Sequence, residues 1–390
     1  MTAVVQEDQL SMGPEGLGIS NEDRDFLREA DVPDYSQGTE PVDLIDLFSG
    51  CGGLTYGALE ALRRVGRGGR LALAVDDDPI PLGVLSKTLG EPLSRFREAD
   101  LAEVLAPVGS DLTADEAVVL REVLPTPREA ILLAGPPCQG HSPLNNHTRH
   151  DDPRNDLYLG VARVAELVAP KAVIVENVGS VASDRRRAVA KCAQALRGLG
   201  YSIATKRLKL RSLGVPQTRV RHLLVATRGE VFDWEALPSL AIRDLGWALE
   251  DLLDAEQRGP FDAPSSPTPE NCARIDWMFD EGEYDLPNDR RPVCHQSEHS
   301  YFSMYGRLRW DRPAQTITSG FGSMGQGRFV HPLRRRTLTP HEAARLQCLP
   351  DYVDFSGVST RGELATMIGN VAPPLLATRI VATLVDQDLL

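Results

Sequence analysis

The sequence predicts an α/β fold in which a mainly parallel sheet is covered by helices on both faces and followed by a smaller second domain. Two observations predict it. Between residues 42 and 227, apolar segments of strand length alternate with segments of helical periodicity, and such alternation is typical of a parallel sheet between helices. The pattern stops near residue 229, and a chain of 390 residues with 42% hydrophobic and 25% charged side chains is long enough for a large domain and a smaller one.

The elements can be assigned in order from residue 42. Residues 42–48 alternate like a strand, a glycine turn follows, and 54–65 have helical periodicity. Further strands are predicted at 71–75, 130–134, 172–176 and 220–227, and further helices at 79–89, 156–168 and 183–199. Residues 102–129 are predicted to form a helical elaboration before the fourth strand.

Charge is distributed unevenly along the chain. Residues 1–40 carry ten carboxylates against two arginines, which predicts a disordered acidic tail with at most a short helix near 21–30. The formal net charge of −13 argues against a nucleic-acid partner. However, residues 290–345 hold ten arginines against three carboxylates. This acidic protein can therefore present a basic face.

The cysteines and the apolar runs indicate the compartment. Six cysteines are scattered without CxxC pairing, which predicts free thiols in a reducing compartment. We find no signal peptide and no apolar run near the roughly 20 residues of a membrane span, so a cytoplasmic protein without membrane contact is expected. No metal is expected either, because Cys272, Cys294, His295 and His299 lack the paired spacing of a zinc site.

A glycine-rich turn, residues 46–54, connects the first predicted strand to the first helix. Glycines at this position let the backbone approach a nucleotide-like ligand. The turn lacks the GxGxxG spacing of dinucleotide-binding folds, which disfavours an NAD-dependent dehydrogenase. The second strand ends at Asp76, where a carboxylate can accept hydrogen bonds from both ribose hydroxyls. Both features fit an adenosine ligand.

A candidate nucleophile follows the strand at 130–134. Residues 135–142 read Gly-Pro-Pro-Cys-Gln-Gly-His-Ser, so two prolines stiffen the turn before Cys138 and a glycine leaves room beside it. A cysteine that only fills a core needs neither. A structural cysteine in a Gly/Pro loop is the alternative, and the pattern favours a nucleophile.

Six segments, in this order, resemble the motifs of the C5-cytosine DNA methyltransferases, and the resemblance covers most of residues 41–390. The segments are 46–54, 135–142, Glu176-Asn177-Val178, Gln217-Thr-Arg219-Val-Arg221, 336–347 and 369–374. The resemblance implies the Rossmann-like sheet of S-adenosylmethionine-dependent methyltransferases with a smaller target-recognition domain. The catalytic and cofactor-binding domain would span 41–228 and the recognition domain 229–365, including the 336–347 motif. Residues 366–390 would then return to the catalytic domain.

This resemblance implies transfer of a methyl group from S-adenosyl-L-methionine to C5 of a cytosine flipped out of double-stranded DNA. Cytosine C5 is a weak nucleophile, and addition of a thiolate at C6 turns the ring into a reactive enamine. Cys138 would supply that thiolate, and Glu176 would protonate or hydrogen-bond N3. Arg219 and Arg221 would hold the ring's O2, the catalytic loop or a phosphate.

The resemblance also implies binding residues. Those for the cofactor are Phe48 (stacking on adenine), Ser49, Gly50, Gly52, Leu54, Asp76 (ribose), Asp100 (adenine amino group), Pro136, Asn370 and Val371. Those for DNA are Gln139, Ser142 and Asn145 beside the nucleophile, and Arg307, Arg309, Thr316, Arg334, Arg335 and Arg336 in the recognition domain.

As for partners, the resemblance implies a monomeric bacterial enzyme that acts on chromosomal DNA in the cytoplasm. It leaves open whether a cognate restriction endonuclease acts separately on the same sequence. Two other functions are alternatives: a tRNA cytosine-5 methyltransferase and a catalytically inactive DNA-binding regulator. The basic recognition segment disfavours the first, and the presence of Cys138, Glu176 and Arg219 disfavours the second.

Overall fold

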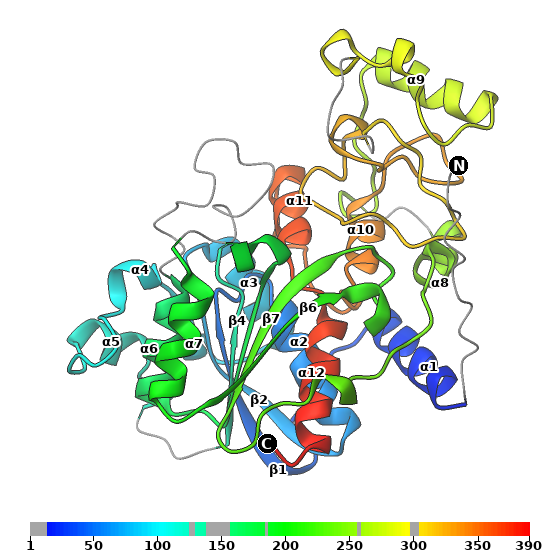
Figure 1. The fold of residues 1–390 in the computed structure, drawn as a ribbon. Helices are drawn as coiled ribbons and strands as arrows, with labels where there is room; N and C mark the ends of the chain where they lie inside the picture. The colour runs from blue at the N-terminus through cyan, green and yellow to red at the C-terminus, as the bar shows by residue number, and fades with distance from the viewer. Residues whose placement is uncertain (1–13, 125–128, 138–156, 184–185, 256–258, 297–303) are drawn as a thin grey trace, which may run out of the picture.

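The computed structural model describes residues 14–124, 129–137, 157–183, 186–255, 259–296 and 304–390. Figure 1 shows a central sheet with helices on both faces and a smaller region, coloured yellow to orange, that projects from one end. The predicted α/β fold, a sheet covered by helices with a smaller additional region, is confirmed.

Seven strands within the described residues form one sheet in the order β3-β2-β1-β4-β5-β7-β6. Their bounds are Thr39–Leu47 (β1), Arg67–Asp76 (β2), Phe96–Glu98 (β3), Ala130–Ala134 (β4), Ala172–Val178 (β5), Ser202–Lys209 (β6) and Val220–Thr227 (β7). Strands β1 to β5 pair in parallel, but β7 runs antiparallel to both β5 and β6. The sheet is therefore mainly parallel, as predicted, and ends in an antiparallel hairpin because the short connection 210–219 joins β6 to β7.

Helices cover both faces of this sheet. Apolar side chains of α2, α3 and α12 form one core cluster with one face of the strands, and those of α6 and α7 form a second cluster with the other face. The helix bounds are Pro14–Arg28 (α1), Gly53–Arg64 (α2), Pro79–Leu89 (α3), Leu101–Val104 (α4), Ala114–Val119 (α5), Leu157–Val168 (α6), Ala188–Gly198 (α7), Leu245–Leu249 (α8), Pro269–Asp280 (α9), Pro340–Leu346 (α10), Arg361–Asn370 (α11) and Pro374–Asp386 (α12).

The projecting region has a small core of its own around α9. Its buried side chains form a cluster separate from the two that line the sheet: Ile275, Met278, Leu286, Tyr305, Met324 and Val330. In contrast, Leu338, Leu346 and Leu349 belong to the main cluster. This packing favours a recognition domain that ends before α10, although the sequence places its boundary at residue 365.

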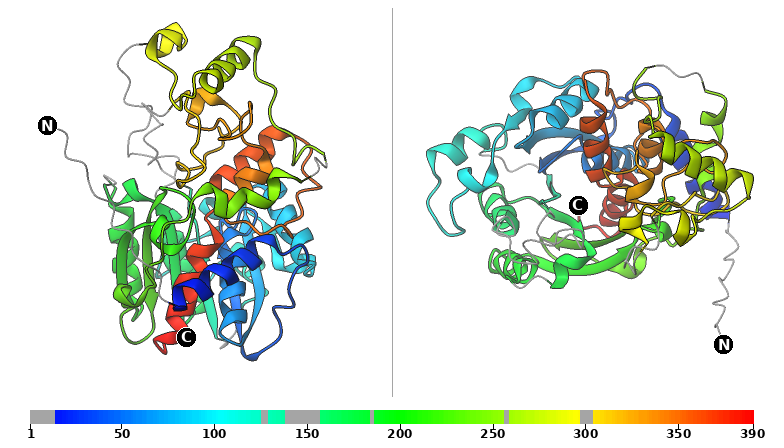
Figure 2. Two further views of the ribbon diagram at one scale, coloured as in Figure 1. Left: turned by 90° about the vertical axis from the view of Figure 1, so that its right-hand side faces the viewer. Right: turned by 90° about the horizontal axis from the view of Figure 1, so that it is seen from above.

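For residues 1–40 the sequence predicts a disordered tail with at most a short helix near 21–30, and the described part of this segment is more ordered than that. Residues 14–28 form α1, and Phe26 and Leu27 are each 1% exposed. Asp23 is fully buried and pairs with Arg64, Arg243 and Arg379. Figure 2 shows α1, in dark blue, crossing the C-terminal helix α12. The segment is ordered because its acidic charge is neutralised by arginines that are distant in the sequence.

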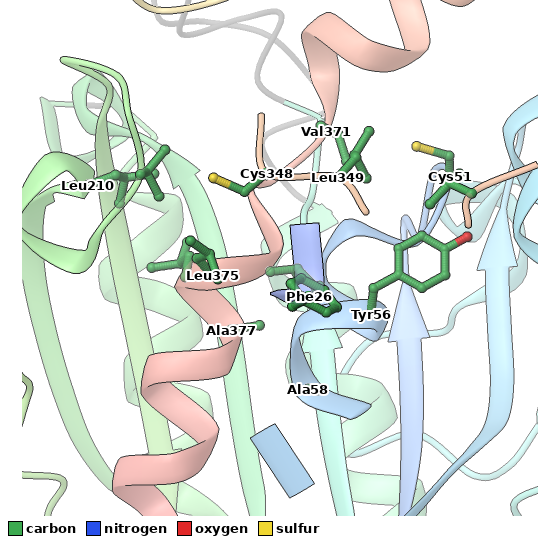
Figure 3. Close-up of a cluster of buried hydrophobic side chains, with 14 of the residues drawn as sticks. Phe26, Cys51, Tyr56, Ala58, Leu210, Cys348, Leu349, Val371, Leu375 and Ala377 are labelled. Atoms are coloured by element: carbon green, nitrogen blue, oxygen red, sulfur yellow. The ribbon is translucent and has the colours of Figure 1, made fainter. Parts of the chain in front are cut away.

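The C-terminal helix α12 lies against α2. A Cβ on Gly57 of α2 would lie 2.0 Å from the carbonyl oxygen of Pro374, so the two helices touch through their backbones. Figure 3 shows Leu375 and Ala377 of α12 in the same buried cluster as Phe26 and Ala58. Residues 366–390 thus pack on the catalytic sheet.

One described stretch, Arg361–Asp386, is long and apolar enough to cross a membrane, which the sequence analysis did not anticipate. It comprises two helices, α11 and α12, separated by 371–373. Of its most apolar window, 78% is buried inside the protein, as in an ordinary core helix. The stretch is therefore only a weak indication of a membrane span.

Candidate active site

Four candidate site residues lie in a row at one edge of the sheet. The parallel register aligns the strand residues Val75, Leu47, Ala134 and Val175 across β2, β1, β4 and β5. The residues that follow them are Asp76, Phe48, Gly135 and Glu176. Ligands of open α/β sheets bind outside these carboxyl ends. The predicted cofactor loop, nucleophile turn and glutamate therefore converge at one edge.

The loop between β1 and α2 is tightly wound. Phe48, Gly50 and Gly52 have positive φ angles of 58°, 52° and 92°, a conformation that glycine adopts readily and phenylalanine rarely does. A Cβ on Gly53 would lie 2.2 Å from the carbonyl oxygen of Ala372 and 2.5 Å from Val371 Cγ2. The absence of that Cβ brings Val371, a predicted cofactor residue, against the start of α2.

Asp76 holds this loop from the neighbouring strand. Its Oδ2 accepts a hydrogen bond from the backbone N–H of Gly50 at 2.7 Å, and its Oδ1 accepts one from Asp78 N at 3.0 Å. Burial raises the pKa of Asp76, against the effect of these two hydrogen bonds. Asp78 caps α3 by accepting from Ile80 N. Of this run of aspartates, Asp76 is thus the one beside the loop.

Two buried polar atoms beside the loop have no hydrogen-bond partner among the described residues: Asp46 Oδ1 and Ser49 Oγ. Asp46 is 1% exposed, and its other oxygen accepts from Thr55 Oγ1 at 2.6 Å. Burial raises the pKa of Asp46 to about 7, with a further contribution from the charge of Asp76. Buried polar atoms rarely lack partners, so a polar ligand at this loop would satisfy both.

The carboxylate of Glu176 is paired with Arg221. Arg221 Nε lies 2.5 Å from Glu176 Oε1, and both side chains are mostly buried. The next residue, Asn177, donates from Nδ2 to the carbonyl oxygen of Pro136 at 2.9 Å. The sequence analysis did not single out Asn177, although its place in the Glu-Asn-Val motif was visible. It fixes the start of the nucleophile turn relative to Glu176.

Arg219 has several partners within the protein, and its predicted contact with the ring, the catalytic loop or a phosphate stays a prediction. It is 2% exposed, and it donates to the carbonyl oxygens of Ile317 at 3.1 Å and Val371 at 3.3 Å. The buried Gln217 accepts from Ile317 N and donates to Gln347 Oε1, both at 2.9 Å. These bonds tie the connection between β6 and β7 to the segments that carry Ile317, Gln347 and Val371.

The remaining cofactor residues surround the same edge. Asp100 follows β3 and caps α4, accepting from Ala102 N at 2.8 Å. Leu54 is 4% exposed at the start of α2, Pro136 is buried, and Asn370 is exposed beside Val371. Their contacts with a cofactor remain predictions.

Three of the predicted DNA-binding arginines are half-buried and bonded within the protein. Arg336 forms a bidentate pair with Glu342, at 2.6 and 2.7 Å, within the capping box of α10. Arg307 donates to the carbonyl oxygen of Pro332 at 2.9 Å, and Arg334 donates to that of Leu253. The structure thus gives these guanidinium groups internal acceptors that the sequence did not reveal.

The others differ in their surroundings. Arg335 is exposed and pairs with Asp276 at 3.1 Å and Asp280 at 2.6 Å on α9. Arg309 is exposed, and Thr316 is half-buried two residues after Ala314, which forms a backbone bridge to Gln217. Of the ten arginines in residues 290–345, four pair with carboxylates within the described residues, so the basic character of this stretch is only partly neutralised: Arg328, Arg335, Arg336 and Arg345.

Cys138, Gln139, Ser142 and Asn145 lie outside the described residues. Among the described cysteines, Cys51, Cys192 and Cys348 are buried, and Cys272 and Cys294 are exposed in the projecting region. Burial raises the pKa of both Cys51 and Cys192 to about 12, which makes them poor thiolate nucleophiles. Within the described residues no three His, Cys, Asp or Glu side chains gather as a metal site would require.

Comparison with known proteins decides the family. Residues 118–386 match the family model of the C-5 cytosine-specific DNA methylases. The chain belongs to this family. The Type II methyltransferase M1.BsuMI of Bacillus subtilis is 40% identical to it over 359 residues, which are 91% of this chain and 83% of that protein. The Type II methylase M.HgiDII of Herpetosiphon aurantiacus is 28% identical over 361 residues, covering 89% and 95%.

Several proteins with solved structures share the fold of this C5-cytosine DNA methyltransferase. The methyltransferase EhMeth of Entamoeba histolytica superposes with a TM-score of 0.60 at 15% identity, covering 90% of this chain and 99% of that one. A DNMT2 mutant of Spodoptera frugiperda has a TM-score of 0.59 at 16% identity, covering 88% and 99%. The likeness to these structures shows the fold, and the family model shows a C-5 cytosine-specific DNA methylase.

Proposed function

We propose that this methyltransferase transfers the methyl group of S-adenosyl-L-methionine to C5 of a flipped cytosine in double-stranded DNA, through a covalent bond between Cys138 and C6. The observation that carries the proposal is the Glu176–Arg221 pair at 2.5 Å, beside the Pro136 turn that leads to Cys138. A carboxylate and a guanidinium side by side at the end of a sheet match the hydrogen-bonding edge of cytosine.

In this mechanism the side chains act on different atoms of the cytosine ring or position one another. The Cys138 thiolate adds to C6 and breaks the C5–C6 double bond, which places electron density on C5. Once C5 carries the methyl group, loss of its proton to solvent restores the double bond and expels the thiolate. Glu176 donates a hydrogen bond or proton to N3, so that the ring does not accumulate negative charge. Arg221 holds the carboxylate and donates to the ring oxygen O2. Arg219 acts as a positioning residue, since its bonds to Ile317 and Val371 fix the β6–β7 hairpin. Ile317 lies in the segment that joins this hairpin to the projecting region around α9, which we call the recognition region.

The described residues fit S-adenosylmethionine. The unpartnered Asp46 Oδ1 and Ser49 Oγ lie in the glycine loop, and Asp76 lies beside it for the ribose. Phe48 stands in the same row for stacking on adenine. When bound, the cofactor supplies an electrophilic sulfonium methyl group.

Two experiments test the proposal. Purified protein and tritiated S-adenosylmethionine are incubated with duplex DNA and, separately, with tRNA; label in DNA alone is expected. Duplex DNA containing 5-fluorocytosine at the target should then trap the protein covalently, and peptide mass spectrometry should locate the adduct at Cys138. An adduct at Cys272 or Cys294, or label in tRNA only, would contradict the proposal.

The biological setting is proposed on the relatives' names. Because several relatives are Type II methyltransferases, we expect a bacterial enzyme that acts on chromosomal DNA in the cytoplasm and protects it against a cognate restriction endonuclease. Restriction of unmethylated DNA by a host extract, blocked by prior treatment with this enzyme, would show that partner.

A further inference from the structure

In the recognition region, guanidinium groups and aromatic rings alternate in a series of five side chains. Arg309 Cζ lies 3.9 Å from the ring centroid of Tyr284, and Arg307 Cζ lies 5.0 Å from the same centroid. Arg307 Cζ also lies 3.7 Å from the ring centroid of Phe279, and Arg335 Cζ lies 5.3 Å from it. We call these residues the arginine–aromatic series.

The inner part of this series is fixed by the protein itself. Arg307 donates through both Nε and Nη2 to the carbonyl oxygen of Pro332. At the far end, Arg335 pairs with two carboxylates of α9. The backbone of Tyr284 is also held, because its carbonyl oxygen accepts from Arg307 N at 2.8 Å and from Arg328 Nη1 at 3.0 Å. Arg307 and Arg335 are thus held in place by partners within the protein.

Arg309 stands at the open end of the series. Its side chain is exposed, and among the described residues it has a ring contact but no hydrogen-bonded or ionic acceptor. The preceding residue, Leu308, is 2% exposed and donates its N–H to Val330 at 2.9 Å, so the backbone here is anchored. A guanidinium stacked flat on a ring keeps its N–H donors free at its edge.

Two other arginines of the basic stretch, Arg290 and Arg312, are also exposed without such an acceptor in the described part of the chain. Arg312 has no ring contact among the described residues, and Arg290 Cζ lies 4.7 Å from the ring centroid of Trp277. Of these three arginines, Arg309 alone combines a ring contact with a position within a few residues of Ala314, which bridges to Gln217 of the hairpin that carries Arg221. It therefore combines a stacked guanidinium, free donors and a direct backbone link to the active site.

We infer that Arg309 is the specificity-determining residue for one guanine of the recognised sequence. Its guanidinium donates two hydrogen bonds to O6 and N7 of that guanine in the major groove, and Tyr284 is the positioning residue that orients it. Among base pairs, guanine alone presents two adjacent acceptors on this edge. Stacking lowers the entropy lost on binding because the side chain is already oriented. The inference rests on the proposed action on duplex DNA.

The experiment starts from wild-type protein, whose recognised sequence is read by bisulfite sequencing of DNA from an expressing host. Initial rates are then measured on the recognised duplex and on duplexes with each base pair changed singly. Arg309→Ala should lose discrimination at one G·C pair by roughly 5- to 150-fold, while discrimination at other positions is retained. Tyr284→Ala should lose part of it at the same pair, and Tyr284→Phe, which keeps the ring, should restore it.

A matched control and a measurement without mutation complete the test. Arg312→Ala, which removes an exposed arginine without a ring contact, should leave the recognised sequence unchanged. On wild-type protein, 7-deazaguanine, which lacks the N7 acceptor, should slow methylation at the same pair that Arg309→Ala relaxes. The 7-deazaguanine scan itself uses wild-type protein only, so it shows whether one guanine needs its N7 acceptor even if the variant folds poorly.

Three results would overturn the inference. Arg309→Ala could slow methylation equally on every duplex and lower the salt dependence of binding by about one unit of slope, as expected for a phosphate contact. It could leave all rates unchanged. The 7-deazaguanine effect could also fall at a pair that the variant still discriminates. If wild-type protein methylates no duplex at all, the proposed function fails instead.

Discussion

At the scale of single residues, the Glu176–Arg221 pair shows how strand direction serves the chemistry. Because β7 runs antiparallel to β5, Arg221 near the start of β7 lies opposite Val178 at the end of β5. A parallel β7 would place its carboxyl end there. The sequence identified both residues through their motifs, but it gave no indication of the reversed strand that joins them.

The first prediction concerns Glu176→Gln. Glutamine keeps the size of the side chain but cannot give a proton to N3, so single-turnover methyl transfer should slow by roughly two to four orders of magnitude. Binding of DNA and cofactor, measured by titration, should change little. A transfer rate within a few-fold of wild type would refute the role of Glu176.

The second prediction concerns Asp46, whose pKa is raised from 3.8 to about 7 by burial. As pH rises from about 4 to 7, the unfolded chain loses this proton and the folded protein keeps it, so the free energy of unfolding should fall over that window. Asp46→Asn has no proton to lose there. Urea unfolding at several pH values should show a flatter dependence in the variant, and identical slopes would contradict this account.

At the scale of elements, α1 shows what the sequence pattern cannot reveal. Locally, residues 14–28 are acidic and polar, which favours disorder. In the fold, burial alone would raise the pKa of Asp23, but the charges of Arg379, Arg243 and Arg64 outweigh it and lower that pKa. Ring contacts such as Phe26 with Tyr352 add packing. Partners so distant in sequence leave no periodic signal.

The strands and motifs were predictable for the opposite reason. Strands β4 and β5 are buried and begin as continuous apolar runs, residues 42–47 of β1 follow an alternating pattern, and the glycine loop between β1 and α2 needs glycine for its backbone angles. Strand β6 was missed because much of it is exposed and polar. The internal acceptors of Arg307 and Arg336 were missed because they are set by the tertiary fold.

The third prediction follows from the buried position of Asp23. Asp23→Ala leaves three arginines without their shared carboxylate, so the free energy of unfolding should fall by about 3–5 kcal/mol. Asp25→Ala, an exposed position on the same helix, should change it by about 0.5 kcal/mol or less. Thermal and urea unfolding of the two variants make the comparison. Equal free energies of unfolding for Asp23→Ala and Asp25→Ala would mean that the ion pairs of Asp23 do not stabilise the fold.

At the scale of the whole molecule, the chain has a large core along the sheet and a small one around α9. The small cluster cannot bury much apolar surface, and small cores are marginally stable. Yet the recognition region is tied to the sheet through Ile317, which bonds to both Gln217 and Arg219. We therefore expect the recognition region to adapt to DNA while its attachment beside the active site stays fixed.

The fourth prediction separates the two cores. Met278 is fully buried in the small cluster, and Met278→Ala should cost about 2–5 kcal/mol there. Because that cost falls on the recognition region, hydrogen exchange around α9 should accelerate and DNA methylation should fall steeply, while S-adenosylmethionine binding by calorimetry stays near wild type.

Leu376→Ala, at a fully buried position in the main core, should weaken cofactor binding as well as methylation. If Met278→Ala instead unfolds the sheet and the recognition region in one transition, the two cores are a single cooperative unit, and the adaptability inferred for the recognition region does not exist.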